Sequence, residues 1–489
     1  MRPKKEISQK TAPLLEELIQ YQNKHYHPFH VPGHKGGGGL LPKWQAYLGQ
    51  GVFSLDLTEV EGLDDLHHPT GVVEAAQKLA ASLMDTKEAY FLVNGVTVGI
   101  HAAIMTLCRP GDTIIMPRHA HRSVYEGMIL AGARPVYLQP ETDEKWGIPL
   151  GVTKKQVAEA IKAHPQGKAI VMVHPTYQGL TSDLCEIGAL AGKAGIPLLV
   201  DEAHGAHFKF SPDFPPSAMS CGATVAVQGW HKTMGSLTQS GLLLLKDRKL
   251  PVQNFLSLLQ STSPSYILMA SLDAARRQWA EKGLQMAEEI VTLSWYFRNK
   301  VTRLNLKGIH CLGEEIINTS GCNDYDPSKL LLNGADLGLN GYQLAQELRN
   351  TYRIQPEMAS LNGVLLIVSL GDTKEQIDYL LDALQDLRSR FPTSKKKRVF
   401  SSLEYKRGEM VLLPGEAMQA HKIRLPWRSA AGRISGEFIC PYPPGIPLVV
   451  PGEKITREAL DHIKQIKSRG GHLQGPGDTT GKTVAVLQE

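Results

Sequence analysis

A rhythm of apolar runs and helical patterns, from about residue 71 to residue 246, constrains the fold more than any other feature of this chain. The apolar runs have the length of strands and are residues 88–93, 112–117, 134–139, 168–175, 196–202 and 223–228. The segments between them show helical spacing and are residues 71–85, 98–108, 121–132 and 183–195. Strands that are apolar almost throughout are buried on both faces, as in parallel sheets covered by helices. We therefore predict an α/β fold with a mostly parallel central sheet and helices on both faces.

The length of the chain indicates several domains, because 489 residues exceed what one hydrophobic core usually holds. An amphipathic helix is predicted at 11–24, and the glycine- and proline-rich segment 29–42 is predicted to be a loop. The four predicted parts are an N-terminal helix with an active-site loop segment at 1–70, a large domain at 71–300, a small α+β domain at 301–392 and a C-terminal domain at 393–489.

Charge and hydropathy exclude two classes of partner. Lysine and arginine number 53 against 48 acidic residues, and no basic stripe is interleaved with aromatic residues, so we expect no nucleic acid. The basic run Lys395–Arg398 is interpreted as a solvated linker. No apolar run is long enough to cross a membrane, and the N-terminus lacks the apolar core of a signal peptide. We predict a soluble, cytoplasmic protein.

Six cysteines lie far apart along the chain, without a C-x-x-C pair. This spacing is typical of reduced thiols in a cytosol and not of a disulfide scaffold or a zinc ribbon. We therefore expect six free thiols.

Polar and reactive residues follow five of the predicted strands, where an α/β sheet keeps its ligands. These strand-end segments are Asn94–Gly99, Arg118–Ser123, His174–Gly179, Asp201–His207 and His231–Lys232. A single such histidine is usually structural, but the clustering at one edge of the sheet predicts a functional site there.

Asp201 and Lys232 follow consecutive strands and are predicted to flank one ring-sized ligand. A lysine amine condenses with an aldehyde, and a buried carboxylate keeps a heterocyclic nitrogen protonated. His121 offers a flat ring for stacking, and the 94–99 turn opens a helix whose N–H groups suit a phosphate. Together these residues meet the requirements of pyridoxal 5′-phosphate (PLP).

A metal site is the rival interpretation of the same strand ends. Asp201, His204 and His207 are candidate ligands, with His119 and His121 as further nitrogen donors. This arrangement would make the chain a metal-dependent hydrolase. It leaves Lys232 without a role and lacks the spacing of known zinc motifs, so we favour PLP and predict no metal.

Several motifs in combination resemble the Orn/Lys/Arg decarboxylases, PLP enzymes of the aspartate-aminotransferase (type I) fold. The motifs are "FHVPGHKGG", "EGLDDLHHPTG", "FLVNGVTVG", "HPTYQG", "LLVDEAHGAHF", "VQGWHKTMGSLTQSG", "STSPSYILMASLD" and "YPPGIPLVVPGE". The resemblance runs from about residue 25 to about residue 475 and is nearest to the short Gram-positive-type members. It implies that 71–300 binds PLP and that 393–489 is a decarboxylase-type C-terminal domain.

The resemblance also implies a role for individual residues. Lys232 resembles the lysine that binds the cofactor aldehyde, and His231 looks like a phosphate-side or proton-handling neighbour. Asp201 looks like the partner of the pyridine nitrogen. His121 matches the histidine that stacks on the ring. The remaining cofactor contacts implied are Ala203 under the ring, His204 beside it, the phosphate turn of Gly95, Val96, Thr97 and Val98, and Thr262 and Ser263.

Thr262 and Ser263 match residues that reach the phosphate of a neighbouring subunit. The resemblance therefore implies a homodimer, or a larger assembly of dimers, with sites at its interface. The implied reaction is decarboxylation of arginine, lysine or ornithine to the amine, which feeds polyamine synthesis. The sequence does not decide among these three substrates.

Two positions depart from the family pattern. Gly229 stands where the pattern "Q-S-x-H-K" has serine, and Val96 replaces the first threonine of "N-G-T-[ST]". Each lost hydrogen bond to a charged phosphate costs about 1.5–3 kcal/mol, so cofactor affinity is expected to fall. A degenerate protein that binds PLP weakly and serves a regulatory role is the alternative to an active enzyme.

An acidic cluster in "TEVEGLDDLHHP" is a candidate receptor for the basic side chain of the substrate. Its members are Glu59, Glu61, Asp64 and Asp65. The same carboxylates also suit helix capping and turns, and both interpretations stay open. A pair of carboxylates would favour arginine, whose guanidinium binds in a bidentate manner.

Overall fold

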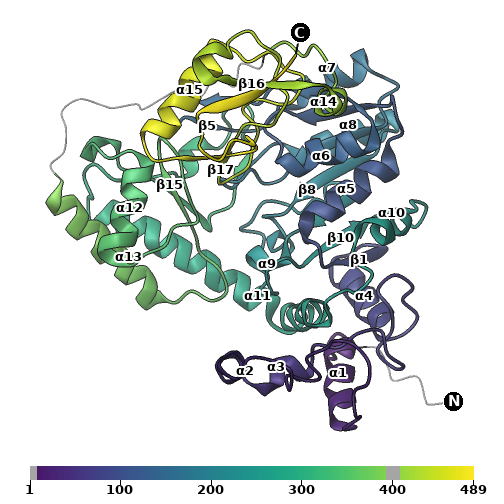
Figure 1. The fold of residues 1–489 in the computed structure, drawn as a ribbon. Helices are drawn as coiled ribbons and strands as arrows, with labels where there is room; N and C mark the ends of the chain where they lie inside the picture. The colour runs from purple at the N-terminus through teal and green to yellow at the C-terminus, as the bar shows by residue number, and fades with distance from the viewer. Residues whose placement is uncertain (1–7, 392–407, 489) are drawn as a thin grey trace.

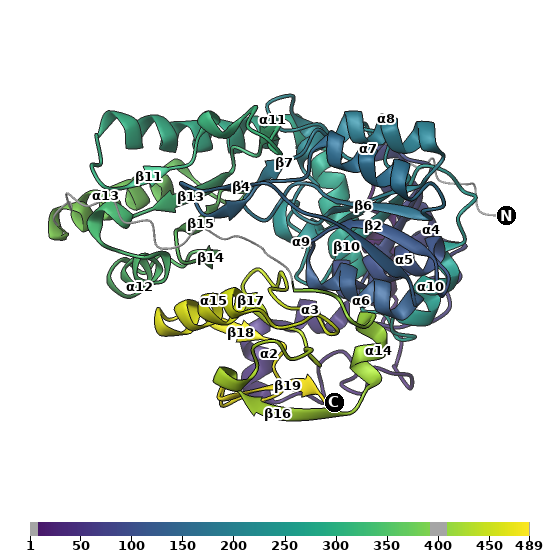
Figure 2. The ribbon, with the colours of Figure 1, turned by 90° about the horizontal axis from the view of Figure 1, so that it is seen from above.

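The computed structural model describes residues 8–391 and 408–488, and its centre is a seven-stranded sheet (Figures 1 and 2). The strand order is β1-β10-β9-β8-β6-β2-β3. The strands are β1 (Glu88–Leu92), β2 (Thr113–Pro117), β3 (Arg134–Leu138), β6 (Ala169–Val173), β8 (Leu198–Glu202), β9 (Val225–Gln228) and β10 (Gly241–Leu245). β10 alone runs in the opposite direction to the other six strands, which therefore end at one edge. The predicted mostly parallel sheet is confirmed.

Helices cover both faces of this sheet. Side chains alternate along each strand, so that Val200 packs into one core and Leu199 into the other. The first core is covered by α4 (Val72–Leu83), α7 (Lys154–Ala163), α8 (Leu184–Ala194) and the long α11 (Tyr266–Arg303). The second is covered by α5 (Gly95–Leu107), α6 (Arg122–Ala131) and α10 (Val252–Leu259). This two-sided burial explains why the strands are apolar throughout.

Gly99 lets helix α5 lie directly against the sheet. A β-carbon there would come within 2.6 Å of Leu92 Cδ1 and 2.7 Å of Val227 Cγ1. Any side chain at this position would push the helix away from β1 and β9. The glycine thus fixes the first turn of α5 at the edge where the parallel strands end.

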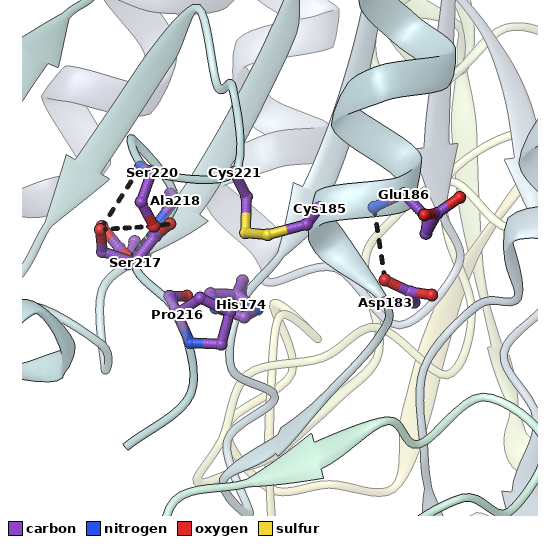
Figure 3. The surroundings of a disulfide bond; sticks show 10 residues. His174, Asp183, Cys185, Glu186, Pro216, Ser217, Ala218, Ser220 and Cys221 are labelled. Carbon is purple, nitrogen blue, oxygen red and sulfur yellow. Dashed lines mark hydrogen bonds between the residues drawn. A yellow bond between two sulfur atoms is a disulfide. The ribbon is translucent and has the colours of Figure 1, made fainter. Parts of the chain in front are cut away.

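The cysteine prediction is wrong at one pair, because Cys185 and Cys221 form a disulfide (Figure 3). Cys185 lies in the first turn of α8, which Asp183 caps by accepting a hydrogen bond from the Glu186 N–H. Cys221 lies 36 residues further along, in the turn before β9. Tertiary packing of α8 against this turn brings the pair together, and sequence spacing carries no sign of it.

The small domain contains a second, four-stranded sheet in the order β11-β13-β15-β14. Its elements are β11 (His310–Cys311), β13 (Lys329–Asn333), α12 (Gly341–Tyr352), β14 (Met358–Ala359), β15 (Val364–Ile367) and α13 (Lys374–Arg390). A short ladder between β12 (Asp324–Tyr325) and β7 (Leu180–Thr181) joins it to the large domain. A separate hairpin pairs β4 (Thr142–Asp143) with β5 (Ile148–Pro149). The β7–β12 ladder brings the start of β13 toward the central sheet.

The C-terminal unit, residues 408–488, packs over the carboxyl edge of the central sheet. It contains α14 (Pro414–Gln419), β16 (Lys422–Pro426), β17 (Cys440–Tyr442), α15 (Arg457–Ser468), β18 (His472–Gln474) and β19 (Thr483–Leu487). Arg118, just after β2, forms a buried ion pair with Glu453 at 2.9 Å and donates to the Pro447 carbonyl. The predicted linker run 395–398 lies outside the described residues.

The N-terminal helices lie at the opposite end of the molecule from this unit (Figure 1). Helix α1 (Pro13–Asn23) buries Leu14 and Leu18 against the large domain, which confirms the predicted amphipathic helix. Short helices α2 (Pro42–Leu48) and α3 (Gln50–Ser54) project from the body beside it. Across residues 8–391 and 408–488, no helix has the length and apolarity needed to span a bilayer.

Candidate active site

A cavity of about 660 Å³ opens where the parallel strands of the central sheet end. Nine of the predicted site residues line it, namely Gly95, Val96, Thr97, His121, Asp201, Ala203, His204, His231 and Lys232. Val98 instead faces the core behind the turn, where it is buried. These nine residues, which follow different strands, therefore share one cavity.

Lys232 lies in a single helical turn, α9 (Trp230–Thr233), directly after β9. Trp230 anchors this turn, because its buried indole N–H donates to Gln228 Oε1 at 3.0 Å. Burial lowers the pKa of the Lys232 amine, while Asp201 and Glu357 act in the opposite direction. A lowered pKa increases the fraction of neutral, nucleophilic amine.

Asp201 ends the neighbouring strand β8 and is buried. Its Oδ1 accepts a hydrogen bond from the Ala203 N–H at 3.2 Å. In the parallel ladder Asp201 pairs with Val227 of β9, five residues before Lys232. Because adjacent strands hold them, Asp201 and Lys232 line the same cavity.

His121 caps helix α6, since its Nδ1 accepts from the Ser123 N–H at 3.2 Å. The neutral ring therefore carries its proton on Nε2. Burial lowers the pKa of His121, and the charge of Lys232 acts in the same direction against Asp201. The ring is a neutral, flat wall of the cavity.

His231 has the opposite tautomer. Its Nδ1–H donates to the Ser240 carbonyl at 2.7 Å, which leaves Nε2 as an acceptor. Burial lowers the pKa of this ring too, and Lys232 adds to the effect. A neutral imidazole with a free acceptor nitrogen can act as a proton carrier beside Lys232.

The first turn of α5 has the features of an anion site. Its N-cap residue, Asn94, makes no capping hydrogen bond to the N–H groups of that turn. Gly95, with a φ of 81°, and Thr97 line the cavity there, and the Thr97 hydroxyl adds a further donor. Thr238, which was not predicted as a site residue, also lines the cavity, and the carbonyl of the next residue, Gln239, accepts a hydrogen bond from the Gly95 N–H.

His204 lies between two lysines. Its Nε2 is 2.8 Å from Lys232 Nζ, and its Nδ1 is 3.1 Å from Lys329 Nζ. Sequence reasoning missed Lys329, because it begins an apolar strand of the other domain. The only available signal was a lysine placed at the head of the buried run "KLLLN".

Glu357 is a second residue that sequence reasoning missed. It lies just before β14 of the small domain, lines the cavity and is exposed. Tyr177 donates its hydroxyl hydrogen to Glu357 Oε1. Burial raises the pKa of Tyr177, and the Glu357 carboxylate raises it further. An anion therefore faces the cavity from the small domain.

The C-terminal unit closes another side of the cavity through Tyr442, Pro443, Pro444 and Ile446. The Gly445 carbonyl accepts from the Arg122 N–H, and a β-carbon on Gly445 would lie 3.2 Å from His121 Nε2. The glycine of the "YPPG" motif thus lets this wall approach the histidine ring.

Other predicted residues lie away from the cavity. Thr262 and Ser263 lie in an exposed loop between α10 and α11. Asp64 Oδ2 accepts hydrogen bonds from the N–H groups of Gly71, Val73 and Glu74, and so caps α4. Asp65 accepts from a nearby backbone N–H, while Glu59 and Glu61 are exposed. In this chain Asp64 caps a helix and Asp65 stabilises a turn.

The rival metal cluster is not assembled. His207 Nε2 lies 3.4 Å from Asp326 Oδ2, away from the cavity-lining residues. Within the described ranges, no three histidine, cysteine, aspartate or glutamate side chains gather in a metal-binding arrangement.

The cavity fits PLP on several independent observations. It offers an amine of lowered pKa, a buried carboxylate on the adjacent strand and a neutral imidazole wall. The first turn of α5, whose N–H groups the Asn94 side chain does not cap, suits a phosphate. Lys232 would hold the aldehyde, Asp201 the ring nitrogen and the 95–97 turn the phosphate.

Comparison with protein families gives two matches. The model described as "Orn/Lys/Arg decarboxylase, major domain" matches residues 12–376. The model described as "Orn/Lys/Arg decarboxylase, C-terminal domain" matches residues 397–480.

Curated relatives and solved structures agree with these matches. An arginine decarboxylase of Bacillus anthracis is 38% identical over 99% of this chain and 98% of its own length. One of Bacillus subtilis is 38% identical over 99% of both chains. The lysine decarboxylase structure from Francisella novicida superposes with a TM-score of 0.84 at 21% identity, covering 98% of this chain and 81% of its own. At this low identity, the structural similarity supports a shared fold and nothing further.

Proposed function

Because the chain belongs to the Orn/Lys/Arg decarboxylase family of PLP-dependent enzymes, it is a lyase that decarboxylates a basic amino acid, and we propose that this amino acid is arginine. The curated relatives at 38% identity over nearly the whole chain are named arginine decarboxylases. The lysine decarboxylase LdcA of Pseudomonas aeruginosa is 25% identical. Relatives thus favour arginine over lysine.

The position of Glu357 is the main structural support for arginine as the substrate. Its carboxylate faces the cavity that Lys232 and Asp201 line, and Tyr177 holds one of its oxygens. A carboxylate accepts two parallel N–H bonds from a guanidinium, which a lysine or ornithine ammonium does not supply. Glu357 therefore replaces the acidic cluster 59–65 as our candidate receptor for the substrate side chain.

We assign the reaction to the following residues. When bound, PLP supplies an electron sink for the electron pair released from the Cα–carboxylate bond. Lys232 would hold the cofactor, Asp201 would keep its ring nitrogen protonated, and His121 would pack against the ring. His231 Nε2, or the amine of Lys232, would carry the proton that Cα receives.

The remaining contacts serve the edges of the cofactor. Ala203 and His204 line the cavity and would lie at the ring, and the Gly95–Val98 turn with the Thr97 hydroxyl would bind the phosphate. Thr238 is a further candidate for the phosphate, because it lines the cavity beside this turn.

We also propose a homodimer. The projecting arm of residues 26–48 exposes several large apolar side chains, which are Tyr26, Phe29, Val31, Leu41, Trp44 and Tyr47. A surface of this kind favours contact with a second copy. Thr262 and Ser263 are exposed and would reach the partner's phosphate site.

We propose that the chain is divided into four parts, at 1–70, 71–300, 301–392 and 393–489. The cavity supports it in one respect, since lining residues come from each of the last three parts: Lys232, Glu357 and Tyr442 are examples.

A competition assay tests the proposal: the purified protein is offered arginine, lysine and ornithine together. We expect a yellow protein that releases CO₂ and forms the amine of arginine in excess of the other two. The Lys232→Ala variant should form none, and borohydride should fix the cofactor on Lys232. Preferential consumption of lysine or ornithine would overturn the substrate. A colourless protein, inert with added PLP, would instead support the weak-binding alternative.

A further inference from the structure

Both ring nitrogens of His204 are engaged by lysine amines. Lys232 Nζ lies 2.8 Å from Nε2, and Lys329 Nζ lies 3.1 Å from Nδ1. His204 is 6% exposed and Lys329 is 1% exposed, so bulk water does not substitute for either contact. One imidazole therefore connects the proposed cofactor lysine to a second buried lysine.

The two hydrogen bonds restrict the number of protons that Lys232, His204 and Lys329 can hold together. A neutral imidazole has one N–H donor and one acceptor nitrogen, whereas an ammonium group can only donate. If one lysine donates to the ring as an ammonium, the other must accept from the ring as a neutral amine. Two ammonium groups cannot both be satisfied.

The His204 ring itself is neutral. Burial lowers its pKa well below the ordinary value, and the adjacent charges of Lys232 and Lys329 lower it further. His121 and His231 act in the same direction from the other walls of the cavity. One of the two lysines is therefore an ammonium group and the other a neutral amine, and the proton that distinguishes them is called the surplus proton.

Lys329 is held rigidly for this contact. The Gly179 backbone has a φ of +93°, and a β-carbon there would come within 2.6 Å of Lys329 Cγ, so the turn packs directly on the lysine stem. Arg298 donates to the Lys329 carbonyl at 3.0 Å. Among the described residues, the hydrogen-bond partner of the Lys329 amine is His204.

We propose that Lys329 is a positioning residue that takes the surplus proton of Lys232 through His204 and so keeps the Lys232 amine neutral and nucleophilic. The inference rests on the proposed role of Lys232 as the cofactor-binding lysine. Lys232 gives a proton to His204 Nε2 as Nδ1 gives its proton to Lys329 Nζ. The ring changes tautomer, and the total charge does not change.

Carboxylates act on both lysines: Asp201 and Glu357 raise the pKa of Lys232, and Asp326 and Glu357 raise that of Lys329. Burial lowers the pKa of Lys329 to about 8, while the nearby carboxylate of Asp326 acts against burial. Asp326 Oδ1 accepts a hydrogen bond from the Ser328 hydroxyl, and Oδ2 lies 3.4 Å from His207 Nε2.

The other groups facing the chain of three residues are few. Glu357 acts on both lysines, Asp201 acts on Lys232, and the Tyr177 ring lies 4.6 Å from the His204 ring. At neutral pH a pKa near 8 leaves Lys329 mostly protonated, as the proposal requires.

Competitive acetylation of the full-length chain, freed of cofactor, tests the proposal without reference to activity. Peptide mass spectrometry gives the pH at which Lys232 becomes half-reactive, over a range of about pH 6 to pH 10. The Lys329→Met variant removes the proton acceptor, and Lys329→Arg keeps a permanent cation. Lys209→Met is the matched control, since it removes a partly buried lysine paired with Asp85 outside the cavity.

We expect the half-reactive pH of Lys232 to rise by about one to two units in Lys329→Met, because a cation close to the amine is lost. Lys329→Arg and Lys209→Met should stay near the wild type. A Lys329→Met profile that superimposes on the Lys209→Met profile would overturn the proposal, as would an equal rise in a folded Lys329→Arg. If Lys329→Met does not fold, Lys329→Gln takes its place with the same expectation.

Borohydride reduction of the holoenzyme separates this proposal from the one it rests on. Cofactor fixed on a lysine other than Lys232 would refute the proposed site. Cofactor fixed on Lys232, with an unshifted profile in the Lys329 variants, would refute only the role of Lys329.

Discussion

Gly229 lies directly against Val96, which lines the cavity: a β-carbon on Gly229 would lie 3.3 Å from Val96 Cγ2. It would also lie 2.7 Å from the Ala203 carbonyl oxygen and 3.2 Å from Lys232 Cδ. The two residues that depart from the family pattern are therefore in contact, and Val96 fills the space that a serine side chain at 229 would need. Neither residue offers a hydroxyl to the phosphate, so we expect Thr97 and Thr238 to supply the side-chain donors.

Restoring the family serine alone is expected to weaken the site. The Gly229→Ser variant should lose about 1–3 kcal/mol of stability through overpacking, with weaker PLP binding in an absorbance titration. Adding Val96→Thr should recover only part of this loss, because the Ala203 carbonyl remains in the way. Gly192→Ser is the control, since nothing lies within 4 Å of a β-carbon there. Tighter PLP binding in Gly229→Ser would contradict this account.

Glu357 should control the binding of the substrate side chain. Its neutral variant, Glu357→Gln, loses a charge-assisted bond of about 1.5–3 kcal/mol, which corresponds to a rise in KM for arginine of roughly 10- to 100-fold. The change in kcat should be smaller, because the carboxylate lies on the small-domain side of the cavity. Steady-state kinetics check this, with the exposed Glu375→Gln as control. An unchanged KM would exclude Glu357 as the receptor.

The strand-end chemistry was predictable because it is local in sequence. Each parallel strand is an apolar run followed at once by its polar residues, so Asp201 and Lys232 could be assigned to one edge of the sheet. The central sheet and its helices followed from the same pattern. The PLP assignment needed only the chemistry of these residues.

Residues brought in from other parts of the chain were not predictable in this way. Glu357 reaches the cavity, and Lys329 reaches the cavity-lining His204, because β12 pairs with β7 across more than a hundred residues. Cys185 and Cys221 meet through the packing of α8. Asp64 suited both a receptor and a helix cap, and only its hydrogen bonds to backbone N–H groups at the start of α4 decided for the cap.

The Cys185–Cys221 disulfide should stabilise the large domain without serving the reaction, since neither cysteine lines the cavity. A loop of this length contributes about 2–4 kcal/mol by restricting the unfolded chain. The Cys185→Ser/Cys221→Ser double variant should therefore unfold at lower denaturant concentration and keep its kcat. A reducing agent should lower the midpoint of the wild type and leave that of the variant unchanged. Equal midpoints for reduced and oxidised wild type would show that the bond contributes nothing.

His174 predicts a loss of stability in mild acid. Its Nε2–H donates to the Pro216 carbonyl at 2.8 Å beside the disulfide (Figure 3), which leaves a buried Nδ1 without a proton. Burial lowers the pKa of His174 to about 4, against a small opposing effect of this hydrogen bond. An unfolded histidine has a pKa of about 6.5.

The sign follows from these two values. As the pH falls from about 6.5 to about 4, the unfolded chain binds a proton that the folded chain refuses, so the free energy of unfolding decreases. The full effect is about 3 kcal/mol for this ring. His174→Gln keeps an N–H donor for the Pro216 carbonyl and cannot titrate. Its stability, measured by urea unfolding at several pH values, should fall less steeply than that of the wild type. The His472→Gln control removes a solvent-exposed ring. Parallel curves for His174→Gln and the wild type would mean that the buried imidazole does not resist protonation.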